Sequence, residues 1–272
     1  MKQLRLRGAA VACALAAALL TIPAGAQSPA PPPHDLEGIV LGESSSTLVA
    51  QQGEPLLVRV QSTGGIAETD YLYLNSSGNA LIFVHLLRGN VAGISIKPAP
   101  SIPPGASSAP MPSVLGVALG DPASKVEALP KNRLVSVNTS EGDVTSTYRG
   151  DNGWEYSFTN TDDKIAWIEA YLTPGAIKAL PNLPEPVLHD GSSIANAIAI
   201  IAPNEKIGIQ AEYIYVAAHP CTDDGQWHGN RAPVIHRAGR SYDQLLATCS
   251  TDGTRRSFFF DTTGIPGSLR GL

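Results

Sequence analysis

Two cysteines lie close to several histidines and aspartates near the end of the chain, and two kinds of chemistry compete for this group. Its members are Cys221 and Cys249, then His219, His228 and His236, and finally Asp223 and Asp224. If the chain is exported, two thiols in one domain favour a bridge, because disulfides persist in oxidising compartments. Zinc sites usually show short paired spacings such as C-x2-C or H-x3-H, which this group lacks. We predict a disulfide between Cys221 and Cys249, with a metal site as the alternative.

Acid–base catalysis is the other chemistry that this stretch could perform. A histidine and a carboxylate act as acid and base when their surroundings push the two pKa values apart. His219 or His228 with Asp223 or Asp224 would supply such a pair, but Thr-Asp-Asp-Gly at 222–225 is also an ordinary turn sequence. We therefore predict that the protein is not an enzyme and binds no cofactor and no metal. The alternative is a periplasmic enzyme with a His/Asp site here, with or without a metal.

Aromatic residues in two further segments suggest a binding face. Tyr71 and Tyr73 alternate with leucines, and Trp167 and Tyr171 flank Glu169, so on a strand each set lies on one face. Protein interfaces are enriched in tyrosine and tryptophan. The candidate interaction face is therefore Tyr71, Tyr73, Trp167 and Tyr171, with burial in the core as the alternative. For a third alternating set the core is favoured: Trp154, Tyr156 and Phe158.

The start of the chain indicates export. Basic residues precede an apolar run from Ala9 to Ile22, and Ala24-Gly25-Ala26 is a small-residue cleavage site, so residues 1–26 are predicted to be a signal peptide. We expect a periplasmic or secreted protein. The leader holds three of the 19 basic residues and none of the 24 acidic ones. The acidic remainder argues against a nucleic-acid partner, and no later apolar run is long enough to predict a transmembrane segment.

Clusters of proline divide the rest of the chain, because proline cannot donate a backbone hydrogen bond and favours extended linkers. The predicted map is a signal peptide (1–26), a Pro-rich tail (27–34), repeat 1 (35–97), a Pro-rich linker (98–112), repeat 2 (113–175), a short Pro-rich linker (181–186) and a C-terminal disulfide-containing domain (187–272).

The two repeats share a motif and a predicted order of elements. Gly38-Ile-Val-Leu-Gly42 matches Gly116-Val-Ala-Leu-Gly120, and a short helix should follow each, over 44–52 or 122–129. Asn-Gly and Gly-Asn pairs then mark tight turns between strands. The predicted strands are 56–61, 71–75, 80–86 and 91–96 in repeat 1, and 134–138, 144–149, 154–159 and 165–172 in repeat 2.

This pattern resembles a known class of modules. The motif G-x-x-L-G, a polar helix start, Gly53-Glu54-Pro55 and tyrosine-bearing strands are similar to repeats of β-lactamase inhibitory proteins and small outer-membrane assembly lipoproteins. The second repeat departs from it, since Lys131 stands where Gly53 does and the proline is missing. The resemblance covers the two repeats and implies a non-enzymatic module that presents a sheet to another protein.

The C-terminal domain has a different pattern. We expect a helix from Ser192 or Ser193 through Ile201, a strand over 207–217, a helix over 242–248 and a strand over 255–261. Short segments resemble a small domain of secreted bacterial proteins and imply no activity: Asn196-Ala-Ile, Ala211-Glu-Tyr, Tyr242-Asp-Gln-Leu and Phe259-Phe-Asp261.

The predicted fold class is therefore α+β, with two tandem helix-plus-antiparallel-sheet repeats followed by a third small α+β domain. The predicted function is that of a non-enzymatic exported protein that binds a protein partner in the cell envelope through an aromatic sheet face.

Overall fold

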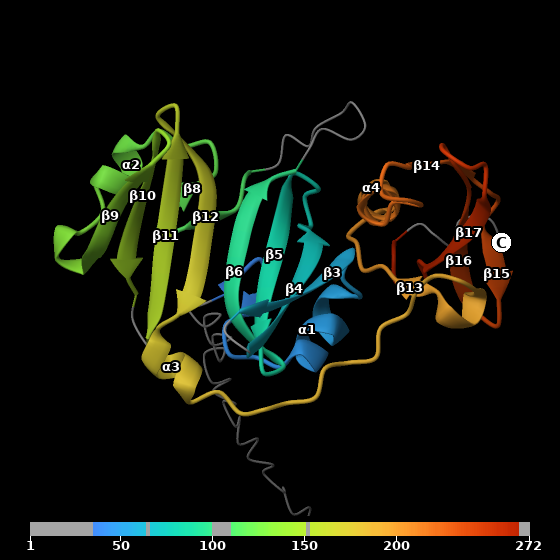
Figure 1. The fold of residues 1–272 in the computed structure, drawn as a ribbon, viewed down its shortest axis with the longest axis horizontal. Coiled ribbons are helices and arrows are strands. Elements are labelled where there is room, and N and C mark those ends of the chain that lie inside the picture. The colour runs from blue at the N-terminus through green and yellow to red at the C-terminus, as the bar shows by residue number, and fades with distance from the viewer. Residues whose placement is uncertain (1–34, 64–65, 100–109, 151–152, 267–272) are drawn as a thin grey trace, which may run out of the picture. The chain divides into compact units, whose positions relative to one another are not determined.

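A computed structural model describes residues 35–63, 66–99, 110–150 and 153–266 (Figure 1). The predicted signal peptide (1–26) and Pro-rich tail (27–34) lie outside the described residues, as does most of the 98–112 linker. Residues 34–272 form one compact unit.

The fold is mostly β, and the predicted α+β class built from separate helix-plus-sheet repeats is wrong. Eight strands form one antiparallel sheet in the order β3-β4-β5-β6-β12-β11-β10-β9 (Figure 1). The two predicted strand sets merge because β6 pairs with β12, with Ile96 opposite Ile168. This pairing satisfies backbone groups on two strands that would otherwise be sheet edges. Local sequence patterns do not record such pairing.

The strands themselves lie close to where alternation and turn residues predicted them. A two-residue hairpin and a helix precede each set of four. The elements of the first half are β1 (Asp35–Leu36), β2 (Ile39–Val40), α1 (Ser45–Gln52), β3 (Leu57–Thr63), β4 (Ile66–Leu74), β5 (Ala80–Leu87) and β6 (Asn90–Pro98). Those of the second half are β7 (Ser113–Val114), β8 (Val117–Ala118), α2 (Ser124–Glu127), η1 (Lys131–Arg133), β9 (Leu134–Ser140), β10 (Asp143–Arg149), β11 (Trp154–Thr161), β12 (Lys164–Leu172) and α3 (Pro174–Lys178).

The two helices before the strand sets differ in how they begin. Ser44 caps α1, since its Oγ accepts a hydrogen bond from the Thr47 backbone nitrogen at 3.0 Å. Asp121 does not cap α2, because one of its carboxylate oxygens accepts instead from the Ala118 backbone nitrogen at 2.7 Å. The second helix follows Ala123, has no side-chain cap and is four residues long, shorter than the predicted 122–129.

One face of the eight-stranded sheet forms the larger core. Leu48 of α1 and Val126 of α2 pack into it beside the fully buried Ile82, Phe158 and Ile168. The set Trp154, Tyr156 and Phe158 is buried there, as predicted.

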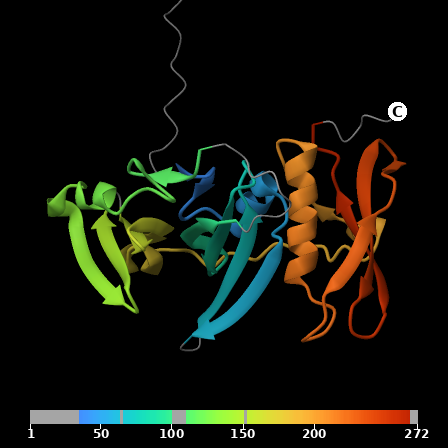
Figure 2. The same cartoon turned by 90° about the horizontal axis from the view of Figure 1, so that it is seen from above.

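Three of the four C-terminal predictions are wrong. The segment 192–201 contains η2 (Ile194–Asn196) and β13 (Ile198–Ala199), 207–217 lies in helix α4 (Glu205–Ala218), and 242–248 lies in strand β16 (Arg240–Cys249). Strand β17 (Arg255–Asp261) is where we predicted it. The C-terminal region forms a five-stranded sheet of β13, β14 (Trp227–Arg231), β15 (Ile235–Arg237), β16 and β17. Helix α4 runs beside this sheet (Figure 2).

In the segments 207–217 and 242–248, the spacing of the apolar residues fits either a helix or a strand. Ile207, Ala211, Ile214 and Tyr215 have the i, i+4, i+7, i+8 spacing of a helix face, and Asn204 accepts a capping hydrogen bond from Ile207. Alternation of isoleucine and tyrosine within the segment suggested a strand instead. Strand β16 shows the reverse case, because its helix-compatible composition is overridden by pairing on both sides.

A second core joins α4 to the other face of the first strands. Leu56 and Leu72 belong to this cluster with Ile207, Ala211 and Ile214. The Gln210 side-chain nitrogen also donates to the Gly78 carbonyl at 2.8 Å. At residues 71–73, β4 is therefore buried on both faces, with Leu72 on the α4 side and the two tyrosines on the α1 side.

The predicted linker at 181–186 lies against the first strand set. The backbone nitrogen of Leu183 donates to the Arg88 carbonyl at 2.9 Å, and Asn90 donates to the Pro181 carbonyl at 2.7 Å. Thr69 donates to the Glu185 carboxylate at 3.0 Å. These contacts tie the linker to the turn between β5 and β6 and to the neighbouring part of β4.

Candidate functional site

The structure removes two tyrosines from the predicted interaction face. Tyr71 is 1% exposed and Tyr73 is 3% exposed, and their rings pack edge to face with centroids 6.4 Å apart. They lie on the side of β4 that faces α1, within the larger core. Burial, with a smaller effect of Glu185, raises the pKa of Tyr71 to about 12. The expectation that these two side chains bind a partner is wrong, because both are buried in the core between β4 and α1.

Trp167 and Tyr171 have a different environment. Their strand, β12, alternates, so that Ile168 and Ala170 enter the core while Trp167, Glu169 and Tyr171 share the opposite face. Both aromatic side chains are partly exposed there. These two members of the predicted face lie together, and Tyr71 and Tyr73 are on the other side of the sheet.

The neighbouring strands supply polar groups to the same surface, which we call the polar face. The register places Ser95 of β6 opposite Glu169, and Ser157 of β11 opposite Glu169 on the other side. Its members are Ser95 and Lys97 of β6, Trp167, Glu169 and Tyr171 of β12, Ser157 and Thr159 of β11, and Thr145 and Thr147 of β10.

Side-chain contacts hold the polar face in place. The Lys97 ammonium lies 3.3 Å from the centroid of the Trp167 ring, a cation–π contact. The Ser157 hydroxyl lies 3.2 Å from the Tyr171 hydroxyl and 2.9 Å from that of Thr147. These contacts restrict the rotamers of both aromatic side chains.

A chain of hydrogen bonds that the sequence analysis missed reaches this face from β4 and β5. Asp70 Oδ1 lies 2.6 Å from His85 Nδ1, and His85 Nε2 lies 3.0 Å from Ser95 Oγ. The Ser95 hydroxyl is also 3.2 Å from Glu169 Oε1. The four residues belong to four strands, so only the sheet register brings them together.

The first three of these residues have the distances of a Ser-His-Asp triad, but the geometry does not support acyl transfer. Ser95 is 1% exposed, so a substrate carbonyl cannot reach its Oγ. Acyl transfer also needs free N–H donors at the developing oxyanion, whereas Ser95 sits in a ladder paired on both sides, with Phe83 and Glu169.

The donor and acceptor roles along this chain depend on the tautomer of the His85 ring. With a hydrogen on Nε2, His85 donates to the Ser95 hydroxyl, which in turn donates to Glu169. Without it, Nε2 accepts from the Ser95 hydroxyl instead.

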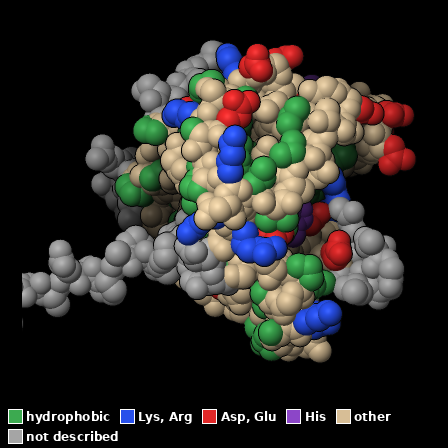
Figure 3. Space-filling model, turned by 90° about the vertical axis from the view of Figure 1, so that its left-hand side faces the viewer, with side chains coloured by type: hydrophobic (Ala, Val, Ile, Leu, Met, Phe, Trp, Pro, Cys, Tyr) green, Lys and Arg blue, Asp and Glu red, His purple; other side chains and the backbone are tan. Residues whose placement is uncertain are grey.

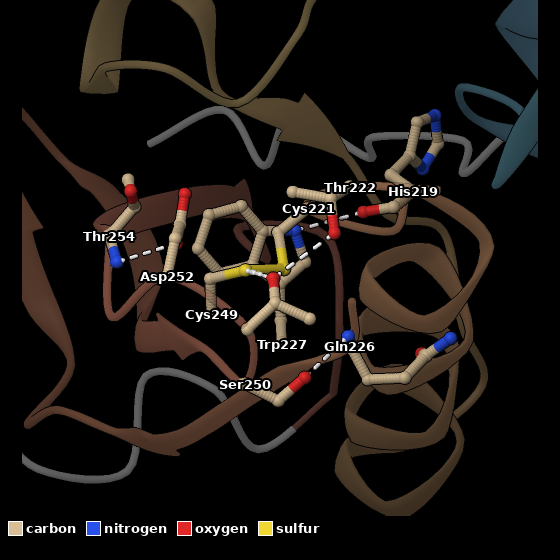
Figure 4. The surroundings of a disulfide bond; sticks show 10 residues. His219, Cys221, Thr222, Gln226, Trp227, Cys249, Ser250, Asp252 and Thr254 are labelled. Atoms are coloured by element: carbon tan, nitrogen blue, oxygen red, sulfur yellow. Dashed lines mark hydrogen bonds between the residues drawn. A yellow bond between two sulfur atoms is a disulfide. The ribbon is translucent and has the colours of Figure 1, made fainter. Parts of the chain in front are cut away.

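The predicted disulfide between Cys221 and Cys249 is present, with Cα atoms 5.8 Å apart (Figure 4). It connects the turn after α4 to the end of β16. Trp227 packs near it, and its indole nitrogen donates to the His219 carbonyl at 2.9 Å.

The residues proposed for an alternative enzyme site are not assembled into one. His219 stacks on Tyr215 with ring centroids 4.1 Å apart, and its Nδ1 lies 2.8 Å from the Tyr215 carbonyl. Asp223, Asp224 and His228 are exposed. Among the residues that the structure describes, no three His, Cys, Asp or Glu side chains are arranged to hold a metal ion.

A buried charge cluster in the C-terminal region also escaped the sequence analysis. Glu212 of α4 is completely buried, and its carboxylate lies 3.5 Å from Nε of Arg231. The Arg231 guanidinium also pairs with Asp243. The cluster borders a cavity of about 420 Å³ lined also by Asn204 and Thr262.

The protonation of Glu212 explains how this cluster is tolerated. Burial, and then the neighbouring Asp243, raises the pKa of Glu212 to about 9, although Arg231 opposes the shift. No hydrogen-bond donor of the described residues reaches either Glu212 oxygen. A proton held by Glu212 keeps that carboxyl group neutral, so that it adds no second buried negative charge beside Asp243. Only the packing of α4 on β14 and β16 reveals this pair.

Among the described residues, no helix has the length and apolar character to cross a membrane. No family model matches the sequence, and no curated protein matches it.

Similar solved structures are distant. A cysteine-rich secretory protein from Staphylococcus aureus subsp. aureus Mu50 is 10% identical over 50% of this chain and 46% of that one, with a TM-score of 0.33. An extracellular protein containing an SCP domain from Bacillus anthracis str. Ames is 10% identical over 54% of this chain and 50% of that one, with a TM-score of 0.34. The chain spans about half the length of these two proteins.

A third structure, a "putative beta-lactamase inhibitor protein" from Streptococcus mutans, is 14% identical over 47% of this chain and 81% of that one, with a TM-score of 0.21. It belongs to a class that the repeats resemble in sequence, but the likeness is weak. TM-scores at this level do not establish a common fold.

Proposed function

We propose that this is a non-enzymatic exported protein that binds a protein partner in the cell envelope through the polar face. The observation that supports this best is the pair Trp167 and Tyr171, which stay partly exposed on either side of Glu169 while the other predicted tyrosines are core. Tryptophan and tyrosine contribute disproportionately to protein interfaces, because they combine a large contact area with a polar tip.

The shape of the surface suits a protein better than a small molecule. Side chains directly opposite each other on paired strands are about 5 Å apart, so the polar face is an even array of groups. Ser95, Ser157 and Thr147 are buried beneath it. The members that reach solvent can contact a matching surface: Lys97, Thr145, Thr159, Trp167, Glu169 and Tyr171. The Lys97 ammonium over Trp167 and the hydroxyl pairs around Tyr171 order the side chains in advance, which reduces the entropy that binding would cost.

A photo-crosslinking residue at position 159 tests the proposal, because Thr159 lies opposite Trp167 and is partly exposed. We expect it to capture one envelope protein, and we expect the Trp167→Ala/Tyr171→Ala variant to lose that product. Tyr213→Ala is the matched control, since Tyr213 is 37% exposed on α4.

A second crosslinker at Val187, which is 91% exposed directly after the linker, reports nonspecific capture. Capture of the same protein from position 187, or capture from position 159 that survives loss of both aromatic side chains, would refute the proposal. Circular dichroism should show that the double variant is folded.

A further inference from the structure

The large sheet ends at β9, which pairs with a strand on one side only. Its partner is β10, with Val137 opposite Ser146 and Asn138 opposite Thr145, and no other described strand lies on its outer side. A strand at such an edge presents backbone N–H and C=O groups that can accept a further strand. The edge is therefore able to extend the sheet.

The side chains of β9 lack the usual protection of a sheet edge. Its sequence, Leu134-Val-Ser-Val-Asn-Thr-Ser140, contains no lysine and no proline. Val135 and Val137 are 44% and 54% exposed. Hydrophobic side chains reach the surface on the side of the molecule that faces the viewer in Figure 3. The bulge in the β9–β10 register falls between Leu134 and Ser136 and leaves the rest of the strand regular.

Val137 continues the apolar face of the sheet. Its neighbour Ser146 is opposite Phe158, whose side chain is fully buried in the larger core. Successive strands place these three side chains on one face, so Val137 is the outermost member of a row that begins in the core. A further strand beside β9 would remove the valine from water.

We propose that this further strand is β9 of a second copy, paired antiparallel about a two-fold axis at Val137. In that register Ser136 lies opposite Asn138 of the other copy, and each Val137 lies beside its equivalent. The arrangement also matches charges. Lys131 and Arg133 precede the strand, while Glu141 and Asp143 follow it, so the basic end of one strand meets the acidic end of the other at both ends of the ladder.

The chain already uses this kind of contact internally. Its two strand sets join through β6 and β12, which pair antiparallel with Ile94 opposite Ala170. A β9–β9 contact is isologous and closes after two copies. A contact between β9 and the opposite edge strand β3 would instead continue into a filament, so the mass of the assembly distinguishes the two.

Light scattering over a range of protein concentrations tests the proposal with a matched pair of variants. We expect the purified protein to reach twice the monomer mass as its concentration rises. Val137→Lys should stay monomeric, because two ammonium groups would meet at the axis. Val60→Lys places the same charge on the other edge strand, where Val60 is 69% exposed, and should dimerise normally.

Cysteine crosslinking locates the axis. Directly opposite residues on antiparallel strands have Cα atoms 4.5–5.5 Å apart, within reach of a disulfide. We expect Val137→Cys to form a covalent dimer under mild oxidation, and neither Val60→Cys nor the parent protein to do so. A protein that is monomeric at every concentration, a dimer that tolerates Val137→Lys, crosslinking through position 60, or filaments would each overturn the proposal.

Discussion

A single buried carboxyl group should make the stability of this protein depend on pH. The pKa of Glu212 is raised from an ordinary 4.5 to about 9 in the folded chain, mainly by burial. Between these values the folded state holds a proton that the unfolded state has released. The free energy of unfolding therefore falls as the pH rises through this range. The folding equilibrium constant decreases by up to about tenfold for each pH unit.

Replacing Glu212 by glutamine should remove this dependence, because the amide keeps a donor and does not titrate. In urea titrations at about pH 5 and about pH 8.5, we expect the variant to gain stability relative to the parent as the pH rises. Glu205→Gln, at a side chain that is 59% exposed in the same cluster, should leave the parent's pH dependence largely unchanged. Parallel pH profiles for Glu212→Gln and the parent would contradict the assignment.

Two buried tyrosines should respond in opposite ways to loss of the hydroxyl group. The Tyr73 hydroxyl has no hydrogen-bond partner among the described residues, and burial raises its pKa well above the usual range. The Tyr148 hydroxyl donates to the Val126 carbonyl at 2.9 Å. We expect Tyr148→Phe to cost about 1 kcal/mol of stability and Tyr73→Phe to be neutral or stabilising.

Urea unfolding of the two variants checks this expectation, and each serves as the control for the other. An equal loss of stability in both would mean that Tyr73 has a partner, such as an ordered water. Neither substitution should affect capture of a partner through the polar face, because both tyrosines lie in the core.

At the scale of elements, helix α4 is attached to the turn between β4 and β5. Gly78 has a positive φ of 71°, and a methyl group there would lie 2.4 Å from Ile207 Cδ1 and 2.6 Å from Gln210 Oε1. Gly142, in the turn between β9 and β10, has a φ of 93° with no atom within 4 Å of that position. The two glycines therefore share backbone strain, but only one touches α4.

Alanine at each glycine should separate strain from packing. We expect Gly142→Ala to lose about 1–2 kcal/mol of stability from backbone strain alone, and Gly78→Ala to lose more. Thermal unfolding followed by circular dichroism measures both. Equal losses would show that α4 does not press on this turn in solution.

At the scale of the whole molecule, the disulfide should stabilise the entire described unit. Cys221 and Cys249 are 28 residues apart, and closing such a loop contributes roughly 3.5 kcal/mol on the chain-entropy model. The second core joins α4 to Leu56 and Leu72 of the first strand set. Loss of the bridge should therefore propagate beyond the C-terminal sheet.

We expect one unfolding transition, which dithiothreitol moves to lower temperature. Trp154 and Trp167 lie in the large sheet, and Trp227 lies in the C-terminal sheet. The fluorescence of a variant that keeps only Trp227, or only the other two tryptophans, therefore reports the unfolding of one sheet alone. A midpoint for the large sheet that ignores the reductant, while that of the C-terminal sheet falls, would show that the two regions unfold independently.

The local features of this protein follow from its sequence. Alternating side chains and Asn-Gly or Gly-Asn turns located the strands of the large sheet, because a strand's period and a turn's positive φ are properties of a few adjacent residues. Two thiols in one domain of a chain that we expect to be exported sufficed to predict the disulfide. The alternation of tyrosine and leucine along β4 also showed that its two faces differ.

What those faces contact depends on how the whole chain folds. The pairing of β6 with β12, the packing of α4 on the leucine face and the burial of Tyr71 and Tyr73 depend on contacts between residues far apart in sequence. The same is true of the chain from Asp70 to Glu169 and of the Glu212–Asp243 pair, each assembled from separate elements. Local periodicity is compatible with several long-range pairings, and the free energy of burying apolar surface and satisfying backbone groups selects among them only when the whole chain is folded.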